Sequence, residues 1–208
     1  MRIDPDAVLW SAPERERAGR PLLVLLHGYG SHEGDLFSLS PGLPLSPVIA
    51  SLRAPLTAGP GNAWFPLSAE TPPDQLEGLV DAAAQAILDW LDTTDSTSVG
   101  LLGFSQGGAT ALQLLRLAPT RFAYTVMLSG FVVGANHPGD AALAAARPPV
   151  FWGRGTVDQV IPGAAIDWTG VWLPKHAETT TRIYEGLAHG ISREELTDIT
   201  AFIGAHLT

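Results

Sequence analysis

The sequence contains no cysteine among its 208 residues. This absence excludes a disulfide scaffold, a thiolate metal site and a cysteine nucleophile. It fits a reducing compartment. The N-terminal residues Met1–Asp6 lack the apolar core of a signal peptide, and the early apolar run Leu22–Leu26 is too short to span a bilayer. We therefore expect a cytoplasmic protein.

Basic residues are also scarce. Twelve Lys and Arg stand against 21 Asp and Glu, for a net charge of −9. This excess of negative charge repels phosphate backbones and anionic lipids, so we expect neither a nucleic-acid partner nor stable membrane association. The hydrophobic content of 46% suits one sizeable core, and we expect residues 1–208 to form a single domain.

Short apolar runs alternate with longer amphipathic stretches along the chain. This alternation predicts an α/β fold with a mostly parallel central sheet flanked by helices. The expected strands are Leu22–Leu26, Val48–Leu52, Ser98–Leu102, Tyr124–Leu128, Val150–Trp152 and Thr180–Tyr184, with a weaker one near Ala7–Trp10. The expected helices are Asp74–Leu91, Gln106–Leu117, Gly163–His176 and one from Ser192 to about His206. Two long connections, Ser40–Pro47 and Arg53–Pro73, show no regular pattern.

The segment Gly103-Phe104-Ser105-Gln106-Gly107 joins a buried strand to a helix rich in small residues. A Gly-x-Ser-x-Gly sequence at such a junction forms a sharp turn that lifts the serine hydroxyl clear of the sheet. The spacing alone arises by chance in about one similar sequence in ten, and a glycine-rich turn without catalytic use is the alternative. The strand before it and the helix after it favour Ser105 as a nucleophile.

A serine nucleophile needs a neighbouring base, and in an α/β-hydrolase the base follows the serine and the acid along the chain. The chain has six candidates: His27, His32, His137, His176, His189 and His206. His189 lies between glycine-containing segments, after the last expected strand and before the last helix. We expect it to be the base.

The acid must hold the imidazole in one tautomer. Asp158 lies in the loop after the strand Val150–Trp152, at the sheet edge where open α/β sheets place their sites. Asp140 is the second candidate.

Acyl transfer also needs donors for the oxyanion. We expect the backbone N–H of Gln106, the residue after the nucleophile, and that of Tyr29, in the loop His27-Gly28-Tyr29-Gly30 after the first strong strand. An ordinary tight turn is the alternative for this loop. A phosphate-binding loop is disfavoured because the P-loop lysine spacing is missing.

These segments, together with Leu128-Ser129-Gly130, Gly155-Thr156-Val157-Asp158 and Ala188-His189-Gly190, resemble the phospholipase/carboxylesterase family. That family includes small bacterial carboxylesterases and acyl-protein thioesterases. The resemblance implies a compact α/β-hydrolase without a large lid domain. It also implies a triad of Ser105, Asp158 and His189, an oxyanion hole at Tyr29 and Gln106, and, since some members dimerise, a possible homodimer.

Trp64 and Phe65 lie in a segment that resembles the one beside the acyl site of the family. We predict that they line the substrate pocket, with Leu36 as a weaker candidate. The alternative is that the two aromatic residues only pin the long loop to the core.

The expected function is hydrolysis of short- to medium-chain carboxylic esters through an acyl-enzyme, with a small-molecule ester as partner and no metal or cofactor required. A thioesterase or lysophospholipase with the same triad is the first alternative. A non-catalytic binding protein on a hydrolase scaffold is a distant one.

Overall fold

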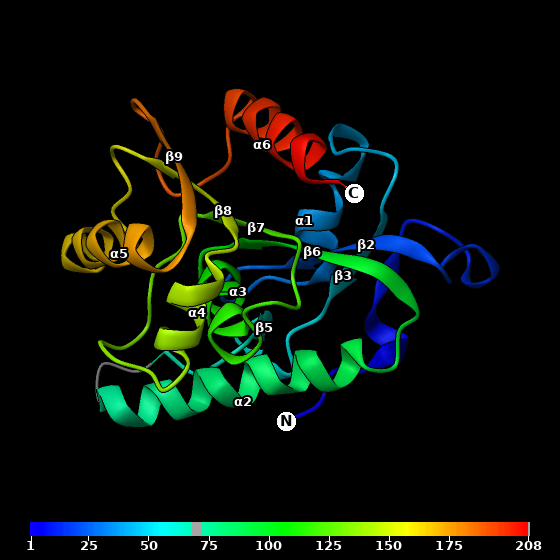
Figure 1. Cartoon of the computed structure of the whole chain (residues 1–208), viewed down its shortest axis with the longest axis horizontal. Helices are drawn as coiled ribbons and strands as arrows, with labels where there is room; N and C mark the ends of the chain where they lie inside the picture. Colours follow the sequence, from blue (N-terminus) through cyan, green and yellow to red (C-terminus); the bar gives the residue numbers. More distant parts are fainter. Residues whose placement is uncertain (68–71, 208) are drawn as a thin grey trace.

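The computed structural model describes residues 1–67 and 72–207. Seven strands form the main sheet, in the order β1-β3-β2-β6-β7-β8-β9 (Figure 1). These strands are β1 Leu9–Trp10, β2 Arg20–Leu26, β3 Val48–Leu52, β6 Ser96–Phe104, β7 Tyr124–Leu128, β8 Pro149–Gly155 and β9 Glu178–Tyr184. β1 is antiparallel to β3, and every other neighbouring pair is parallel. The predicted, mostly parallel sheet is confirmed.

Helices cover both faces of this sheet. They are α1 Glu33–Phe37, α2 Pro73–Leu91, α3 Gln106–Leu117, α4 Asp140–Ala146, α5 Gly163–His176 and α6 Arg193–His206, with 3₁₀ turns at Pro5–Ala7, Glu14–Glu16 and Ser40–Gly42. In Figure 1, α2 and α3 lie below the sheet and α6 lies above it. The short helices α1 and α4 were not predicted, because five to seven residues carry too little periodicity to recognise.

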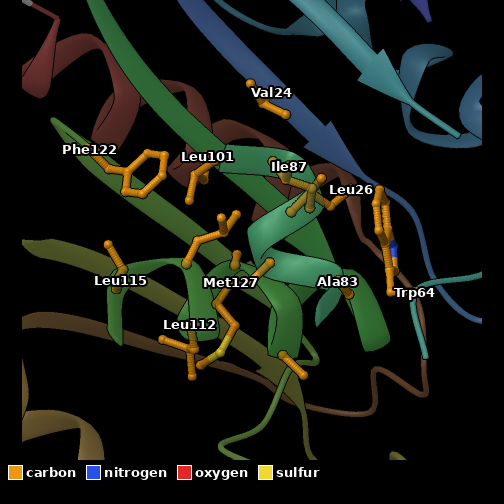
Figure 2. Close-up of a cluster of buried hydrophobic side chains, with 14 of the residues drawn as sticks. Val24, Leu26, Trp64, Ala83, Ile87, Leu101, Leu112, Leu115, Phe122 and Met127 are labelled. Carbon is orange, nitrogen blue, oxygen red and sulfur yellow. The ribbon is translucent and has the colours of Figure 1, made fainter. Parts of the chain in front are cut away.

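The two faces of the sheet form two hydrophobic clusters. Alternate β2 side chains divide between them: Val24 and Leu26 pack toward α2 and α3, whereas Leu23 and Leu25 pack toward α1 and α6. Figure 2 shows the first cluster between the sheet and these two helices. Burial on both faces explains why the central strands are continuous apolar runs rather than alternating ones.

The long connection after β3 contains regular structure that the sequence did not predict. β4 Leu56–Ala58 and β5 Gly61–Ala63 form an antiparallel hairpin. Gly59 in its turn has φ +59°, a left-handed conformation that glycine adopts without strain. Residues 68–71 of the same connection lie outside the described residues. The hairpin places the segment after it, which includes Trp64, beside the first strong strand of the sheet.

Parallel strands end at the same edge, so the loops after β2, β6, β8 and β9 converge. These loops carry Tyr29, Ser105, Asp158 and His189, respectively. Within the described residues, no helix is both long and apolar enough to cross a membrane.

Candidate active site

Ser105 occupies a sharp turn between β6 and α3. Its φ of 55° and ψ of −116° lie where non-glycine residues are strained, as expected for a serine held at such a turn. Two backbone hydrogen bonds fix it: Ser105 N–H donates to Leu128 O at 2.8 Å, and Ala109 N–H donates to Ser105 O at 3.0 Å. Ser105 is thus anchored to the neighbouring strand β7 and to the first turn of α3.

The glycines on either side of Ser105 allow backbone segments to approach closely. A Cβ at Gly103 would overlap the backbone of Gly107, and a Cβ at Gly107 would overlap the Leu26 carbonyl oxygen. The turn therefore packs directly against the end of β2. This close approach is the physical reason for the glycine spacing around the serine.

His189 and Asp158 form a hydrogen-bonded pair. Nδ1 of His189 lies 2.7 Å from Oδ2 of Asp158, and the Asp158 side chain is 2% exposed. The other carboxylate oxygen accepts from the backbone N–H groups of Val160 and Ile161 at 2.9 and 3.2 Å. Burial alone would raise the pKa of Asp158, but the hydrogen bonds from His189 and from these two amides outweigh it and lower the pKa. The carboxylate therefore stays ionised and can hold Nδ1 of His189 protonated.

Ser105 and His189 line one cavity of about 570 Å³ at the carboxyl edge of the sheet. The His189 ring packs against Phe104, with ring centroids 4.8 Å apart, so the residue before the serine supports the imidazole. The structure thus brings together the three predicted residues Ser105, Asp158 and His189, in the chain order serine, acid, histidine.

The two predicted oxyanion residues, Tyr29 and Gln106, line the same cavity. A Cβ on Gly28 would lie 3.5 Å from the Ser105 Cβ, so the loop that carries Tyr29 runs directly beside the serine. Within the described residues, neither the Tyr29 nor the Gln106 N–H donates to a backbone carbonyl of a turn or loop. The structure thus brings both residues to the cavity that Ser105 lines, and their role as oxyanion donors stays a prediction.

His27 shapes this loop through hydrogen bonds to the backbone. Its Nε2 accepts from Ala54 N–H at 3.1 Å, so the proton sits on Nδ1, which lies 2.7 Å from Gly28 O. Burial lowers the pKa of His27 and keeps the ring neutral. Both ring nitrogens are occupied by the backbone, which leaves His27 a structural role.

Trp64, Phe65 and Leu36 do not line the cavity, and the structure corrects their prediction as pocket residues. Trp64 and Phe65 are 0% exposed, and Leu36 packs into the cluster beneath α1 and α6. Figure 2 shows Trp64 beside Leu26, at the end of β2. The physical reason is that these side chains bury more apolar surface in the core than they would in an open cavity.

The segment of Trp64 and Phe65 instead holds the proposed oxyanion residues in place. Trp64 N–H donates to Gln106 Oε1 at 2.9 Å, and Gln106 Nε2 donates to Phe65 O at 2.6 Å. The Trp64 indole N–H donates to His27 O at 2.8 Å. The structure therefore agrees with the alternative stated for Trp64 and Phe65, in which they pin the long loop to the core.

Residues that were not predicted as pocket residues form the apolar wall of the cavity. They include Leu67, Phe131, Val160, Ile161, Pro162 and Ala165. Most of them follow the carboxyl ends of β7 or β8. This position could have indicated them from the sequence, because loops at that edge surround the site in open α/β sheets.

Asp140, the second candidate acid, lies elsewhere. Its Oδ1 accepts from Arg116 Nε at 2.8 Å, and the Arg116 side chain is 1% exposed. His176 and His206 each bond through Nδ1 to a carbonyl of their own helix at 2.8 Å. These groups have structural partners away from Ser105.

A serine on a strand–helix turn, followed along the chain by an acid after β8 and a histidine after β9, defines an α/β-hydrolase. The chain belongs to the phospholipase/carboxylesterase family, whose model matches residues 12–207. The resemblance seen in the sequence is thereby confirmed, and membership makes the protein a hydrolase.

Several relatives have names that specify an activity. A probable carboxylesterase of Oryza sativa is 27% identical over 177 residues, which cover 80% of this chain and 65% of that protein. The carboxylesterase SOBER1 of Arabidopsis thaliana is 27% identical over 81% of this chain and 76% of that protein. Acyl-protein thioesterase 1 of Candida albicans is 28% identical over 92% of this chain and 94% of that protein.

Solved structures agree on the fold. Esterase PE8 superposes with a TM-score of 0.73 at 26% identity and covers 100% of both chains. Acyl-protein thioesterase 2 of Zea mays superposes with a TM-score of 0.79 at 24% identity and covers 97% of this chain and 99% of that one. The predicted α/β-hydrolase fold is confirmed.

Proposed function

We propose that this protein is a serine carboxylesterase that hydrolyses short- to medium-chain carboxylic esters through an acyl-enzyme. The observation that carries this proposal is that His189 lines the same cavity as Ser105 while its Nδ1 lies 2.7 Å from Asp158 Oδ2. The relatives named as carboxylesterases support it.

In the first half of the proposed reaction, Ser105 Oγ attacks the ester carbonyl carbon and His189 takes the hydroxyl proton. Asp158 holds the imidazole in the correct tautomer and stabilises its charged form. The Gln106 and Tyr29 N–H groups donate to the oxyanion. The C–O bond to the leaving alcohol then breaks, and His189 gives the alcohol its proton. In the second half, water attacks the acyl-Ser105 ester by the same route and releases the acid.

The cavity suits a small ester. Its volume of about 570 Å³ falls in the range of pockets that enclose small molecules, and its wall is mostly apolar, which favours an acyl chain of short to medium length.

A thioesterase activity of the same triad is the second candidate, because several relatives are named acyl-protein thioesterases. Matched oxygen-ester and thioester substrates of rising chain length separate the two. A lysophospholipase would require turnover of lysophospholipids over the same series. Turnover of any simple ester would contradict the distant alternative of a non-catalytic binding protein.

The test of the nucleophile is covalent labelling by a fluorophosphonate probe. Wild type is expected to be labelled, and Ser105→Ala to lose both labelling and hydrolysis of p-nitrophenyl butyrate while unfolding at the wild-type temperature. Ser46→Ala is the matched control, because Ser46 is exposed and lies just before β3, at the opposite edge of the sheet. Labelling of Ser105→Ala would contradict the proposal.

We further propose a cytoplasmic location, a small-molecule ester as the main partner and, as one assembly to test, a homodimer. The lack of cysteine and the excess of acidic residues support the first two. Size-exclusion chromatography with light scattering measures whether the protein forms the homodimer.

A further inference from the structure

The cavity has two chemically different sides, and Ser105 lies between them. In the sheet, β2 lies on one side of β6, and β7 and β8 lie on the other. Tyr29, Ser31 and Asp35 reach the cavity from the segment after β2, and we call this set the β2 arm. The β8 arm is Phe131, Val160, Ile161 and Ala165, which follow β7 or β8.

The β8 arm is entirely apolar, whereas the β2 arm carries a carboxylate. Ser31 Oγ donates to Asp35 Oδ2 at 2.6 Å, which holds the carboxylate at the cavity wall. Among the described residues, the lining contains Asp35 and His189 but neither Lys nor Arg. The β2 arm is therefore a negatively charged side of the cavity.

Within the part of the chain that the structure describes, no Lys, Arg or His forms a salt bridge with Asp35. Arg53 is bonded to Glu33 through two guanidinium nitrogens. His32 Nδ1 accepts from Gly34 N–H at 3.1 Å, so this nitrogen is bonded to the backbone and not to Asp35. The protein as a whole carries a net charge of −9, which reinforces the negative potential at the cavity.

Tyr29 adds an aromatic face to the same arm. Tyr29 lines the cavity and is 47% exposed, so the residue is open to a ligand. An aromatic ring beside a carboxylate is a combination that attracts alkylammonium groups, through the ring quadrupole and through direct charge attraction.

We propose that the β2 arm binds the leaving alcohol and selects alcohols that carry an ammonium group, while the β8 arm holds the acyl chain. This inference rests on the proposed esterase function and deepens it. An alcohol bearing phosphate should be disfavoured, because its charge meets Asp35 without a basic partner in the cavity wall.

The test compares two esters of the same shape and different charge. Butyrylcholine carries a quaternary nitrogen, and 3,3-dimethylbutyl butyrate has a carbon in its place. The expected kcat/KM ratio of the cationic to the neutral ester is roughly three to ten for wild type at low salt, because Asp35 is exposed and partly screened. In 0.5 M NaCl the ratio is expected to fall at least about twofold.

Asp35→Asn keeps an acceptor for Ser31 and removes only the charge, so its ratio is expected to fall toward one, with the Tyr29 ring keeping a smaller preference for the cation. Asp95→Asn is the control with the same change in net charge, because Asp95 is exposed and lies just before β6, at the far edge of the sheet. It should keep the wild-type ratio. Thermal unfolding of both variants verifies the fold. The measurement in 0.5 M NaCl tests the charge preference of the wild type without any substitution.

A second pair tests the anionic case: 1-butyrylglycerol should be hydrolysed at least about fivefold faster, by kcat/KM, than its 3-phosphate. Two results would overturn this inference: a wild-type cationic-to-neutral ratio of one or below, or an unchanged ratio in Asp35→Asn. The proposed esterase function would still stand, provided that p-nitrophenyl butyrate is hydrolysed. If kcat/KM favours a cationic ester only when the ammonium group is on the acyl chain and not on the alcohol, the assignment of the two arms is wrong. Absence of p-nitrophenyl butyrate hydrolysis overturns the proposed function itself.

Discussion

The indole N–H of Trp64 donates to the carbonyl oxygen of His27 at 2.8 Å, although the two residues are 37 positions apart. His27 opens the loop that carries Tyr29, and both of its ring nitrogens are already bonded to the backbone. A buried tryptophan in the connection after β5 therefore holds one half of the proposed oxyanion site, without being exposed to substrate.

Trp64→Phe removes this donor and leaves the His27 carbonyl without its partner. We expect kcat for p-nitrophenyl butyrate to fall about tenfold with little change in KM, because the Tyr29 N–H loses its fixed position. The free energy of unfolding should fall by about 1–3 kcal/mol. Steady-state kinetics and urea denaturation measure the two effects.

Trp168→Phe is the matched control. Trp168 is 40% exposed, and its indole N–H donates to Gly134 O at 3.3 Å on the surface. It should leave kcat unchanged. A wild-type kcat in Trp64→Phe would show that the indole hydrogen bond is not needed to position the loop.

Asp158→Asn and Asp140→Asn separate the two acids that the sequence offered. Asp158→Asn should reduce kcat by about 10³–10⁴, because an amide no longer enforces the required tautomer of His189. Asp140→Asn should preserve kcat at temperatures where the variant is folded. It should lower the free energy of unfolding by about 2–3 kcal/mol, because the buried Arg116 loses its charged partner.

Kinetics below the unfolding temperature, together with denaturation curves, measure this pair. The reverse result, with activity lost in Asp140→Asn and kept in Asp158→Asn, would reassign the acid.

Glu195 gives a prediction on pH. The residue is 1% exposed in α6, and within the described residues both of its carboxylate oxygens lack a hydrogen-bond partner. Burial, aided by the nearby Asp198, raises its pKa to about 7. The folded protein thus retains a proton that the unfolded chain releases above its ordinary pKa of 4.5. This group therefore lowers stability as the pH rises from about 4.5 to about 7.

Glu195→Gln cannot ionise and should escape this loss. We expect the variant to be more stable than wild type by about 2–3 kcal/mol at pH 8, with the difference shrinking toward zero near pH 4.5. Glu194→Gln, at the exposed neighbouring position, is the control and should show no such trend. Denaturant unfolding at several pH values gives the difference; a constant offset would mean that Glu195 does not titrate in this range.

The strands and the grouping of the proposed catalytic residues could be predicted because their causes are local. A strand buried on both faces must be a continuous apolar run, as in Leu22–Leu26, and a backbone that crowds β2 requires glycine at position 107. The parallel arrangement then brings the loops after β6, β8 and β9 to one edge, so the positions of Ser105, Asp158 and His189 along the chain were enough to group them.

Only the tertiary structure decided what surrounds these residues. Trp64 and Phe65 are apolar whether they face a substrate or the core, and their burial depends on contacts with His27 and Gln106 that are about 40 residues distant. The contrast between the β2 arm, which carries Asp35, and the apolar β8 arm, which carries Ile161, also depends on tertiary contacts. Local pattern thus determined which chemistry the chain carries. Long-range packing, which no local pattern encodes, determined the shape and charge of the cavity in which that chemistry takes place.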